Sequence, residues 1–426
     1  MGRKKNRKAR RSTLTETAAT SAVPVLDVPK PAPVWGRDLI DPAAITQMEN
    51  AMRLPVTIAG ALMPDAHVGY GIPIGGVVAL ENAVAPYMVG VDIACRMHMS
   101  IFANEHLDLI ENASRREQLK RAMREETRFG IGASFEGRDR REHAVMEDED
   151  WSLTKAIAHL KDKAWTQLGT SGSGNHFLDA GVLIPASDDA ARILGIEPGR
   201  EHFAFMSHSG SRGTGAQIAD HYSRLAQQIT PLPPALRHLA WLPLDSDPGQ
   251  EYWRAMNLMG RYAQANHESL HRHLQKHLKL KAITELDNHH NFAWKETLAD
   301  GTVAYVHRKG ATPAGAGVLG IIPGSQGHDS FIVRGKGSAL SLNSASHGAG
   351  RMMSRGHAKR SIPKADRDRW LESRGVELMD AGMDEAPQAY KDIRQVLAEQ
   401  SDLVEVLATF RPRVVLMARA GERAED

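Results

Sequence analysis

Apolar positions recur at helical spacing in three stretches of the chain. The first begins at residues 41–42, where an aspartate followed by a proline favours a helix start, and continues to about residue 52. A second helix is predicted over residues 117–126. The longest is predicted over residues 250–278, where one face carries Trp253, Met256, Leu270, Leu274 and Leu278.

Between these helices lie short apolar runs that end in glycine-rich loops. No fixed-period repeat is present. Short apolar runs bounded by glycine are typical of buried strands. The pattern therefore predicts an α+β fold whose loops carry the chemistry, with strands at VVAL (77–80), YMVGVDIA (87–94), AYVH (304–307), GIIPGS (320–325) and SFIVRG (330–335).

Composition places the 426-residue chain among ordinary globular proteins, with 42% hydrophobic and 24% charged residues. No apolar run approaches the roughly 20 residues that a membrane-spanning helix needs. No charged-then-apolar signal peptide opens the sequence. The single cysteine, Cys95, excludes an intrachain disulfide and fits a reducing compartment. We therefore expect a cytoplasmic protein.

Charge is distributed unevenly along the chain. Seven basic residues and no acid lie between Arg3 and Arg11, so the net charge of +2 leaves −5 for the remainder. The residues that follow show little periodicity, and we predict a flexible basic tail over residues 1–34. Such a tail is either simply solvated or contacts nucleic-acid phosphates.

Several loops set histidine, aspartate, cysteine or asparagine among glycines and serines. Glycine allows close backbone approach, and turned loops present amide N–H groups to anions. Metal-ligand side chains in anion-binding loops indicate phosphate chemistry on a metal. The loops are MPDAHVGYGIPIGG (63–76), VGVDIACRM (89–97), GTSGSGNHFLD (169–179), MSHSGSRGTG (206–215), DNHHNFAWKE (287–296), VHRKGATPAG (306–315) and NSASHGAGRMMSR (343–355).

The candidate metal ligands begin with Asp92 and Cys95, which form a D-x-x-C motif after an apolar run. A lone cysteine is more often a small buried residue than a ligand. The candidate histidines are in polar surroundings, which argues against a purely packing role; they are His176, His208 and His290. Oxygen, sulfur and nitrogen ligands together suit Mn, Zn, Fe or Co.

Three cations in these loops, Arg212, Lys309 and Arg351, could hold phosphate oxygens. For each one, the alternative is a solvated surface cation.

A different motif, His267–Glu268–Ser269–Leu270–His271, matches the H-E-x-x-H pattern of zinc proteases on a predicted helix. No G-x-x-H continuation follows it, and further histidines crowd the stretch, so we expect a chance match.

Taken together and in order, the loops resemble the RtcB family of RNA-splicing and RNA-repair ligases. The resemblance extends from about Met63 to Val415. It implies that the chain shares the family's fold of packed mixed β-sheets with peripheral helices, as one large domain over residues 35–426. The motifs that carry it are PDAHVGYGIPIGG, GVDIAC, GSGNHF, HSGSRG, HRKGA, IPGS, VRG, SHGAGR with MSR, and EAPQAYKDI.

The resemblance also implies a site. His347 in SHGAGR falls on the histidine that becomes guanylylated. Five residues fall on the ligands of two Mn²⁺ ions, with the cysteine bridging: Asp92, Cys95, His176, His208 and His290. Further residues fall on positions that bind GTP or phosphate: Asn175, Asp179, Arg212, Lys309, Ser346, Gly348, Ala349, Gly350 and Arg351.

The implied reaction joins RNA 3′-phosphate or 2′,3′-cyclic phosphate ends to 5′-hydroxyl ends, using GTP and Mn²⁺. It passes through guanylylated His347 and an RNA-(3′)pp(5′)G intermediate, in RNA splicing or repair. Candidate partners are broken or spliced RNA, including tRNA, and an archease-type activator. The alternatives are a metal-dependent RNA phosphoesterase or nuclease without nucleotide transfer, and a non-catalytic RNA-binding relative. The presence of His347 favours the ligase, because hydrolysis does not need that nucleophile.

Two positions depart from the family pattern. Asp179 stands where the family usually has a glutamate that reads the guanine edge. Leu416 stands where the family has a lysine that touches the nucleotide, and no lysine follows Lys391. Both changes concern the base pocket, so we expect weaker discrimination for guanine.

Overall fold

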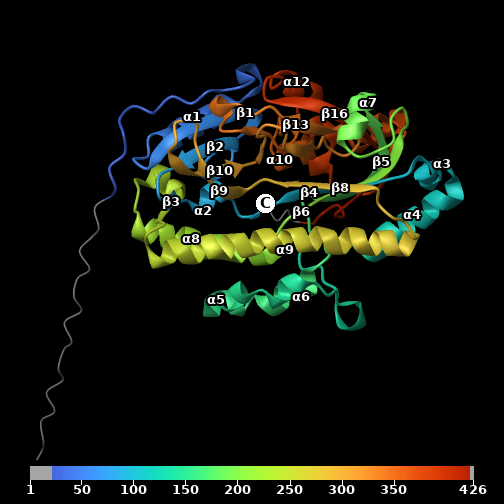
Figure 1. The fold of residues 1–426 in the computed structure, drawn as a ribbon, viewed down its shortest axis with the longest axis horizontal. Helices are drawn as coiled ribbons and strands as arrows, with labels where there is room; N and C mark the ends of the chain where they lie inside the picture. Colours follow the sequence, from blue (N-terminus) through green and yellow to red (C-terminus); the bar gives the residue numbers. More distant parts are fainter. Residues whose placement is uncertain (1–21, 423–426) are drawn as a thin grey trace, which may run out of the picture.

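The computed structural model describes residues 22–422. Residues 1–21 and 423–426, which include the predicted basic run Arg3–Arg11, lie outside the described part. The described chain is a single mixed α+β domain built on several antiparallel sheets, as the sequence predicts. Figure 1 shows the sheets in the centre and upper part of the molecule, with helices around them.

The larger sheet has the strand order β12-β13-β16-β5-β6-β4-β8, with β15 paired parallel to β16. The other pairings are antiparallel. Asn288 of β8 donates to Ile321 O at 3.2 Å, and its side-chain oxygen accepts from Ile321 N at 2.8 Å, which ties the two ends of the sheet together. The strands are β4 (Arg96–Phe102), β5 (Phe177–Pro185), β6 (His202–Ser209), β8 (Thr284–His289), β12 (Leu319–Ile322), β13 (Ser330–Gly335), β15 (Glu377–Asp380) and β16 (Val404–Met417).

A second antiparallel sheet has the order β1-β2-β10-β9. Two short two-stranded antiparallel sheets, β11 with β14 and β3 with β7, accompany it. The chain passes from β8 of the larger sheet directly into β9, so the two sheets meet beside residues 289–292. The strands are β1 (Thr57–His67), β2 (Ile74–Leu80), β3 (Ala83–Val84), β7 (Leu242–Pro243), β9 (Phe292–Thr297), β10 (Val303–Lys309), β11 (Ala311–Pro313) and β14 (Ser344–Ser346).

The longest helix, α9 (Asp247–Leu278), runs beneath β4 and β6, with α8 (Arg212–Ile229) beside it. Ser246 caps α9 by accepting a hydrogen bond from Gly249 N, which satisfies an otherwise free amide. The remaining helices are α1 (Pro42–Met52), α2 (Pro86–Val89), α3 (Asp108–Glu111), α4 (Ala113–Glu126), α5 (Lys155–Ala158), α6 (Lys161–Gln167), α7 (Asp188–Ile193), α10 (Arg355–Ser361), α11 (Lys364–Ser373) and α12 (Ile393–Ala398).

The three predicted helices are confirmed as α1, α4 and α9, and Asp41 caps α1 as its position suggests. The predicted strand over residues 87–94 is wrong. Pro86 starts the short helix α2 there, because proline suits the first turn of a helix, and a loop follows. The apolar residues of this stretch, among them Met88 and Val89, are buried without pairing in a sheet.

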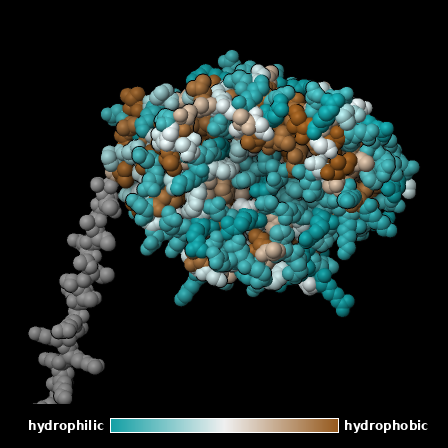
Figure 2. All heavy atoms as spheres, viewed as in Figure 1, coloured by the Kyte–Doolittle hydropathy of each residue, from teal (hydrophilic) through white to brown (hydrophobic). Residues whose placement is uncertain are grey.

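Residues 22–34 lie along the folded chain. Val23 N donates to Pro231 O at 2.7 Å, and Lys30 N donates to Met52 O at 3.1 Å. This stretch therefore differs from the expected flexible tail, whose other residues lie outside the described part. Within residues 22–422, no helix combines the length and the apolar character needed to cross a membrane. The face drawn in Figure 2 is mostly hydrophilic, with apolar residues in separate patches.

Candidate active site

The predicted metal ligands lie at one edge of the larger sheet, where four neighbouring strands begin or end. Cys95 immediately precedes β4, and His176 immediately precedes β5. His208 lies near the end of β6, and His290 follows β8. Because these strands are antiparallel neighbours, the starts of β4 and β5 meet the ends of β6 and β8. Residues almost 200 positions apart are thus brought together.

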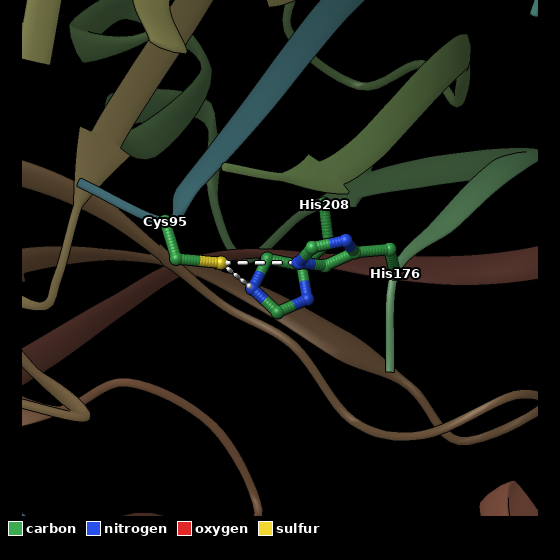
Figure 3. Close-up of side chains that lie close together, drawn as sticks. All are labelled: Cys95, His176 and His208. Carbon is green, nitrogen blue, oxygen red and sulfur yellow. Dashed lines mark hydrogen bonds between the residues drawn. The ribbon is translucent and has the colours of Figure 1, made fainter. Parts of the chain in front are cut away.

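Cys95, His176 and His208 point toward one another (Figure 3). The Cys95 Sγ lies 3.1 Å from His208 Nε2 and 3.5 Å from His176 Nε2. All three side chains are buried, and one donor atom from each lies within 4.8 Å of the others. Donor atoms around a tetrahedral ion with bonds of 2.0–2.3 Å are roughly 3.5 Å apart, so the spacing fits a shared metal ion.

Asp92 and His290 extend this cluster on either side. Asp92 Oδ2 lies 3.1 Å from His176 Nε2, and His290 Nε2 lies 3.3 Å from His208 Nε2. Gly210 allows the aspartate to come close, since a Cβ at that position would lie 2.0 Å from Asp92 Oδ1. The five predicted donors therefore form one continuous series.

Charge states in the cluster favour metal binding. Burial, together with electrostatic repulsion between the neighbouring His176 and His208 rings, lowers the pKa of His208 to about 3, and burial lowers the pKa of His290 well below its usual range. Burial raises the pKa of Asp92, but the hydrogen bond and charge of His176 and the charge of Arg212 outweigh it, and the pKa falls to about 2. Neutral imidazoles and an ionised carboxylate are the forms that bind a metal cation.

His347 lies beside this cluster and is held by Asp65. The imidazole Nδ1 donates to Asp65 Oδ2 at 2.7 Å, and the His347 backbone N donates to the same oxygen at 3.1 Å. With the proton on Nδ1, the lone pair is on Nε2. The His347 and His290 rings are 4.8 Å apart between centroids, which places the predicted nucleophile next to a predicted metal ligand.

Asp65 is fully buried, which raises its pKa. The hydrogen bond and charge of His347 and the charge of Lys391 outweigh burial, so the pKa of Asp65 is lowered. Lys391 Nζ donates to the carbonyls of Pro64 at 3.0 Å and Ala66 at 2.8 Å, on either side of the aspartate. Gly350 packs directly against the backbone of Asp65. Its φ is +73°, and a Cβ at this position would lie 2.0 Å from Asp65 O, so only glycine fits here.

Asp65 and Lys391 are not among the site residues predicted from the sequence. Both lie in motifs that carry the family resemblance, PDAHVGYGIPIGG and EAPQAYKDI. An acid inside a glycine-rich loop was the available signal for Asp65. Nothing in the sequence pairs it with a histidine 282 positions later.

A cavity of about 580 Å³ joins the cluster of candidate metal ligands and His347. Three predicted nucleotide residues do not line it, although they are buried nearby: Asp179, Arg212 and Ser346. Arg212 Nη1 instead lies 3.3 Å from Nδ1 of His176, one of the candidate metal ligands. The predicted nucleotide residues that do line it are Asn175, Lys309, Gly348, Ala349, Gly350 and Arg351.

The three predicted phosphate-binding cations are not solvated surface residues. Arg212 and Lys309 are buried, and burial lowers the pKa of Lys309 to about 7. Arg351 is half-buried and donates to Asp384 O at 2.7 Å and to the Tyr390 hydroxyl at 3.0 Å. The surface-cation alternative is therefore wrong for all three.

Asp179 is a buried acid in apolar surroundings. It lies on β5 between Met206 of β6 and Val415 of β16. Burial raises the pKa of this carboxyl group well above its usual range. Its Oδ1 has no hydrogen-bond partner among the described residues. Burial therefore favours the protonated, neutral form of this carboxyl group over the ionised form.

The second departure, at Leu416, needs a correction. Leu416 is in an apolar cluster with Leu178 and does not line the 580 Å³ cavity. The next residue, Met417, lines the cavity together with Phe177, its partner across β16 and β5. Successive side chains of a strand point to opposite faces, so a shift of one residue changes which side chain meets the cavity.

The H-E-x-x-H pair on α9 serves packing between the helix and the larger sheet. His267 Nδ1 and His271 Nε2 both lie 2.7 Å from the Ser207 hydroxyl. The other ring nitrogens contact Ser209 O at 3.1 Å and the Ser100 hydroxyl at 2.8 Å. All four nitrogens thus have hydrogen-bond partners, as expected of a chance match to the protease motif.

Comparison with known proteins adds evidence independent of this geometry. A family model described as "tRNA-splicing ligase RtcB" matches residues 47–418. The chain is 34% identical over 414 residues to RNA-splicing ligase RtcB of Escherichia coli strain K12, covering 89% of this chain and 96% of that protein. It is 32% identical over 438 residues to tRNA-splicing ligase RtcB of Nanoarchaeum equitans, covering 87% of this chain and 91% of that protein.

Proposed function

Because the chain belongs to the tRNA-splicing ligase RtcB family, we propose that this RNA ligase joins RNA 3′-phosphate or 2′,3′-cyclic phosphate ends to 5′-hydroxyl ends through a guanylylated His347. The observation that carries the proposal is the position of His347. Its ring is hydrogen-bonded to the buried Asp65 at 2.7 Å, and it lies beside His290. Both histidines line the cavity that four of the five candidate metal ligands also line.

The covalent step uses the nitrogen of His347 that Asp65 leaves unprotonated. The Nε2 lone pair attacks the α-phosphate of GTP, a P–N bond forms, and the bond from the α-phosphorus to the bridging oxygen breaks, which releases pyrophosphate. Attack places positive charge on the imidazole. The Asp65 carboxylate stabilises that charge and keeps the ring in the required tautomer and orientation.

We infer that the donor series would hold two Mn²⁺ ions. When bound, such ions neutralise phosphate charge and polarise the bond that breaks. The donors present fit this group, since the set combines a cysteine sulfur, imidazole nitrogens and a carboxylate at metal-ligand spacing. The set is Asp92, Cys95, His176, His208 and His290.

The remaining steps act on RNA. A 2′,3′-cyclic phosphate is opened by water to a 3′-phosphate. That phosphate displaces His347 from the guanylyl group to form RNA-(3′)pp(5′)G, and the 5′-hydroxyl of the second RNA end then attacks the RNA phosphorus and releases GMP. Asn175, Lys309 and Arg351 line the cavity and supply donors for the phosphates. Proposed partners are broken or spliced RNA, including tRNA, and an archease-type activator.

The second candidate function is a metal-dependent RNA phosphoesterase that transfers no nucleotide. It would need the metal donors but would not need a histidine oriented by a buried carboxylate. The deciding experiment incubates the protein with radiolabelled GTP and Mn²⁺ and separates it on a denaturing gel. We expect a label that is lost in acid, survives alkali and is absent from His347→Ala. Cleavage of RNA without any label would favour the phosphoesterase, and equal labelling of His347→Ala would exclude the proposed nucleophile.

A further inference from the structure

Tyr70 is an aromatic residue whose side chain lies open at the rim of the 580 Å³ cavity. The residue is 72% exposed, and Val68 beside it is 51% exposed; both line the cavity. The other six tyrosines of the chain are buried or half-buried. An exposed aromatic ring at a cavity rim has no role in packing the core.

The backbone around Tyr70 is fixed although its side chain is largely exposed. Gln47 of α1 donates to Gly69 O at 2.6 Å and accepts from Gly69 N at 3.1 Å. Lys309 at the end of β10 donates to Tyr70 O. The residues that flank and carry the ring are therefore held from two other elements, so the ring is presented at a defined place on the rim.

A second ring and a cation lie next to Tyr70. The His238 ring centroid is 6.4 Å from that of Tyr70 and 4.9 Å from that of Tyr87, in edge-to-face geometry. Arg237 is exposed and its Nε lies 3.2 Å from His238 Nε2. We call Val68, Tyr70, His238 and Arg237 the rim platform: it combines an open aromatic face with a positive charge.

The rim platform is also close to the reacting histidine. Lys309, which holds the Tyr70 carbonyl, is followed by Gly310. Gly310 lies against the His347 ring, where an added Cβ would be 3.1 Å from Cε1. A ligand whose end reaches His347 can therefore extend over the platform.

We propose that the rim platform stacks an unpaired nucleobase next to the reacting RNA end, with Arg237 contacting its phosphate. Single-stranded RNA is bound in this way, by aromatic rings under the bases and cations along the backbone. A protein partner fits less well, since a stable protein interface buries about 1,200–2,000 Å² and the platform consists of four side chains. The inference rests on the proposed function, because it assumes RNA at the site.

The test measures RNA binding separately from chemistry. The full-length protein with Mn²⁺ and no GTP is titrated with a short 3′-phosphate RNA that carries fluorescent 2-aminopurine beside its terminal nucleotide. Stacking on Tyr70 should quench the fluorescence. Tyr70→Ala should lose the quenching and weaken binding roughly tenfold, within the range of one stacked base. Tyr70→Phe keeps the ring and should retain both.

Val303→Ala is the matched control, because Val303 is also exposed, at 48%, and begins β10, roughly 20 Å from Lys309 at its other end. It should behave as the wild type. Arg237→Gln should lower the salt dependence of binding by about one phosphate contact. In ligation, Tyr70→Ala should raise the KM for RNA more than it lowers kcat.

If Tyr70→Ala keeps the quenching and affinity of the wild type, the proposed stacking on the rim platform is wrong. It is also wrong if Tyr70→Phe loses as much quenching and affinity as Tyr70→Ala. Failure of the proposed function gives a different result, with quenching intact but no label on His347 from GTP. Since Tyr70 is 72% exposed, the variants should fold, and circular dichroism of each variant checks this.

Discussion

The Asp65 carboxylate accepts hydrogen bonds from both the ring and the backbone of His347, at 2.7 and 3.1 Å through one oxygen. Two donors from one residue fix the position of its main chain and the rotation of its ring together. Lys391 holds the strand on both sides of Asp65, so the pair is part of a rigid arrangement. A histidine held in this way would need little rearrangement for the proposed attack on phosphorus.

Asp65→Asn should therefore slow guanylylation of His347 while the protein stays folded. Asparagine has nearly the same shape, but it lacks the negative charge that favours the Nδ1–H tautomer and stabilises the charged ring. We expect the initial labelling rate at saturating GTP and Mn²⁺ to fall by roughly 10²-fold or more. Asp300→Asn, in the exposed turn between β9 and β10, is the control and should label normally. A normal rate in Asp65→Asn would mean that the carboxylate only packs.

Much of the site could be predicted from the sequence, because its ligand types stand in loops whose glycines mark close approach. Cys95 and His208 were placed in one site by the resemblance to the RtcB family, which the order of the motifs carries. Asp65 could not be found in this way. Its role depends on β1 packing against the loop that carries His347, a contact between distant parts of the chain that no local pattern records.

The incorrect predictions share a different cause. Residues 87–94 have the apolar composition of a strand, but Pro86 and burial by surrounding elements produce a helix and a loop. At the C-terminal strand, the prediction of Leu416 at the cavity was wrong by one position, which in a strand reverses the face. Residue type was informative in both cases, whereas register and tertiary burial were needed to place the side chains.

Cys95→Ala should lose bound metal and ligation together. The thiol lies 3.1 and 3.5 Å from two histidine nitrogens, so its removal breaks the series of donors in the middle. Metal content measured by mass spectrometry after purification should fall clearly below that of the wild type. If Cys95→Ala keeps the metal content of the wild type, the cysteine is a buried packing residue and not a metal ligand.

His267→Ala supplies the matched comparison in the same assay. It should keep its metal, because the ring contacts Ser207 and Ser209 and no metal donor. Its free energy of unfolding should fall by about 1–3 kcal/mol, since buried polar groups lose their partner. Loss of metal from a folded His267→Ala variant would indicate that the H-E-x-x-H motif binds metal after all.

Asp179→Asn should change how stability depends on pH. The pKa of Asp179 is raised in the folded state by burial, so between its unfolded and folded pKa values the folded protein keeps a proton that the unfolded chain releases. Stability from this group is complete below the unfolded pKa and is lost as pH rises through the folded pKa, at up to about 1.4 kcal/mol per pH unit. Asparagine lacks this dependence.

Denaturant unfolding of both proteins at several pH values measures the effect. Relative to the wild type, Asp179→Asn should gain stability as pH rises above the unfolded pKa of about 4. The comparison uses the change with pH, because the new amide adds a constant cost or benefit at all pH values. A difference that does not vary with pH would show that the carboxyl group finds a partner or water in solution.

The last prediction concerns base discrimination in nucleotide transfer. The RtcB resemblance gives Asp179 the place of a glutamate that reads guanine, yet this shorter side chain is buried in apolar surroundings and does not line the cavity. Met417 presents a thioether there, in a region where the family has a lysine. A hydrogen bond between a carboxylate and a base contributes about 1.5–3 kcal/mol, or one to two decades in affinity. We therefore expect weaker use of GTP, or a smaller preference for GTP over ATP, than in a family member that keeps the glutamate and the lysine.

Labelling of His347 against concentration for GTP, ATP and ITP measures this preference, and ITP reports on the guanine amino group alone. The wild type should differ little between the three nucleotides. Asp179→Glu restores the side-chain length of the family's glutamate. It extends the carboxylate by about 1.5 Å toward the cavity wall formed by Phe177 and Met417. If the missing length is the cause, this variant should gain preference for GTP and ITP over ATP. A preference for GTP over ATP of roughly a hundredfold or more in the wild type would mean that other groups read the base, because it exceeds what one such hydrogen bond supplies.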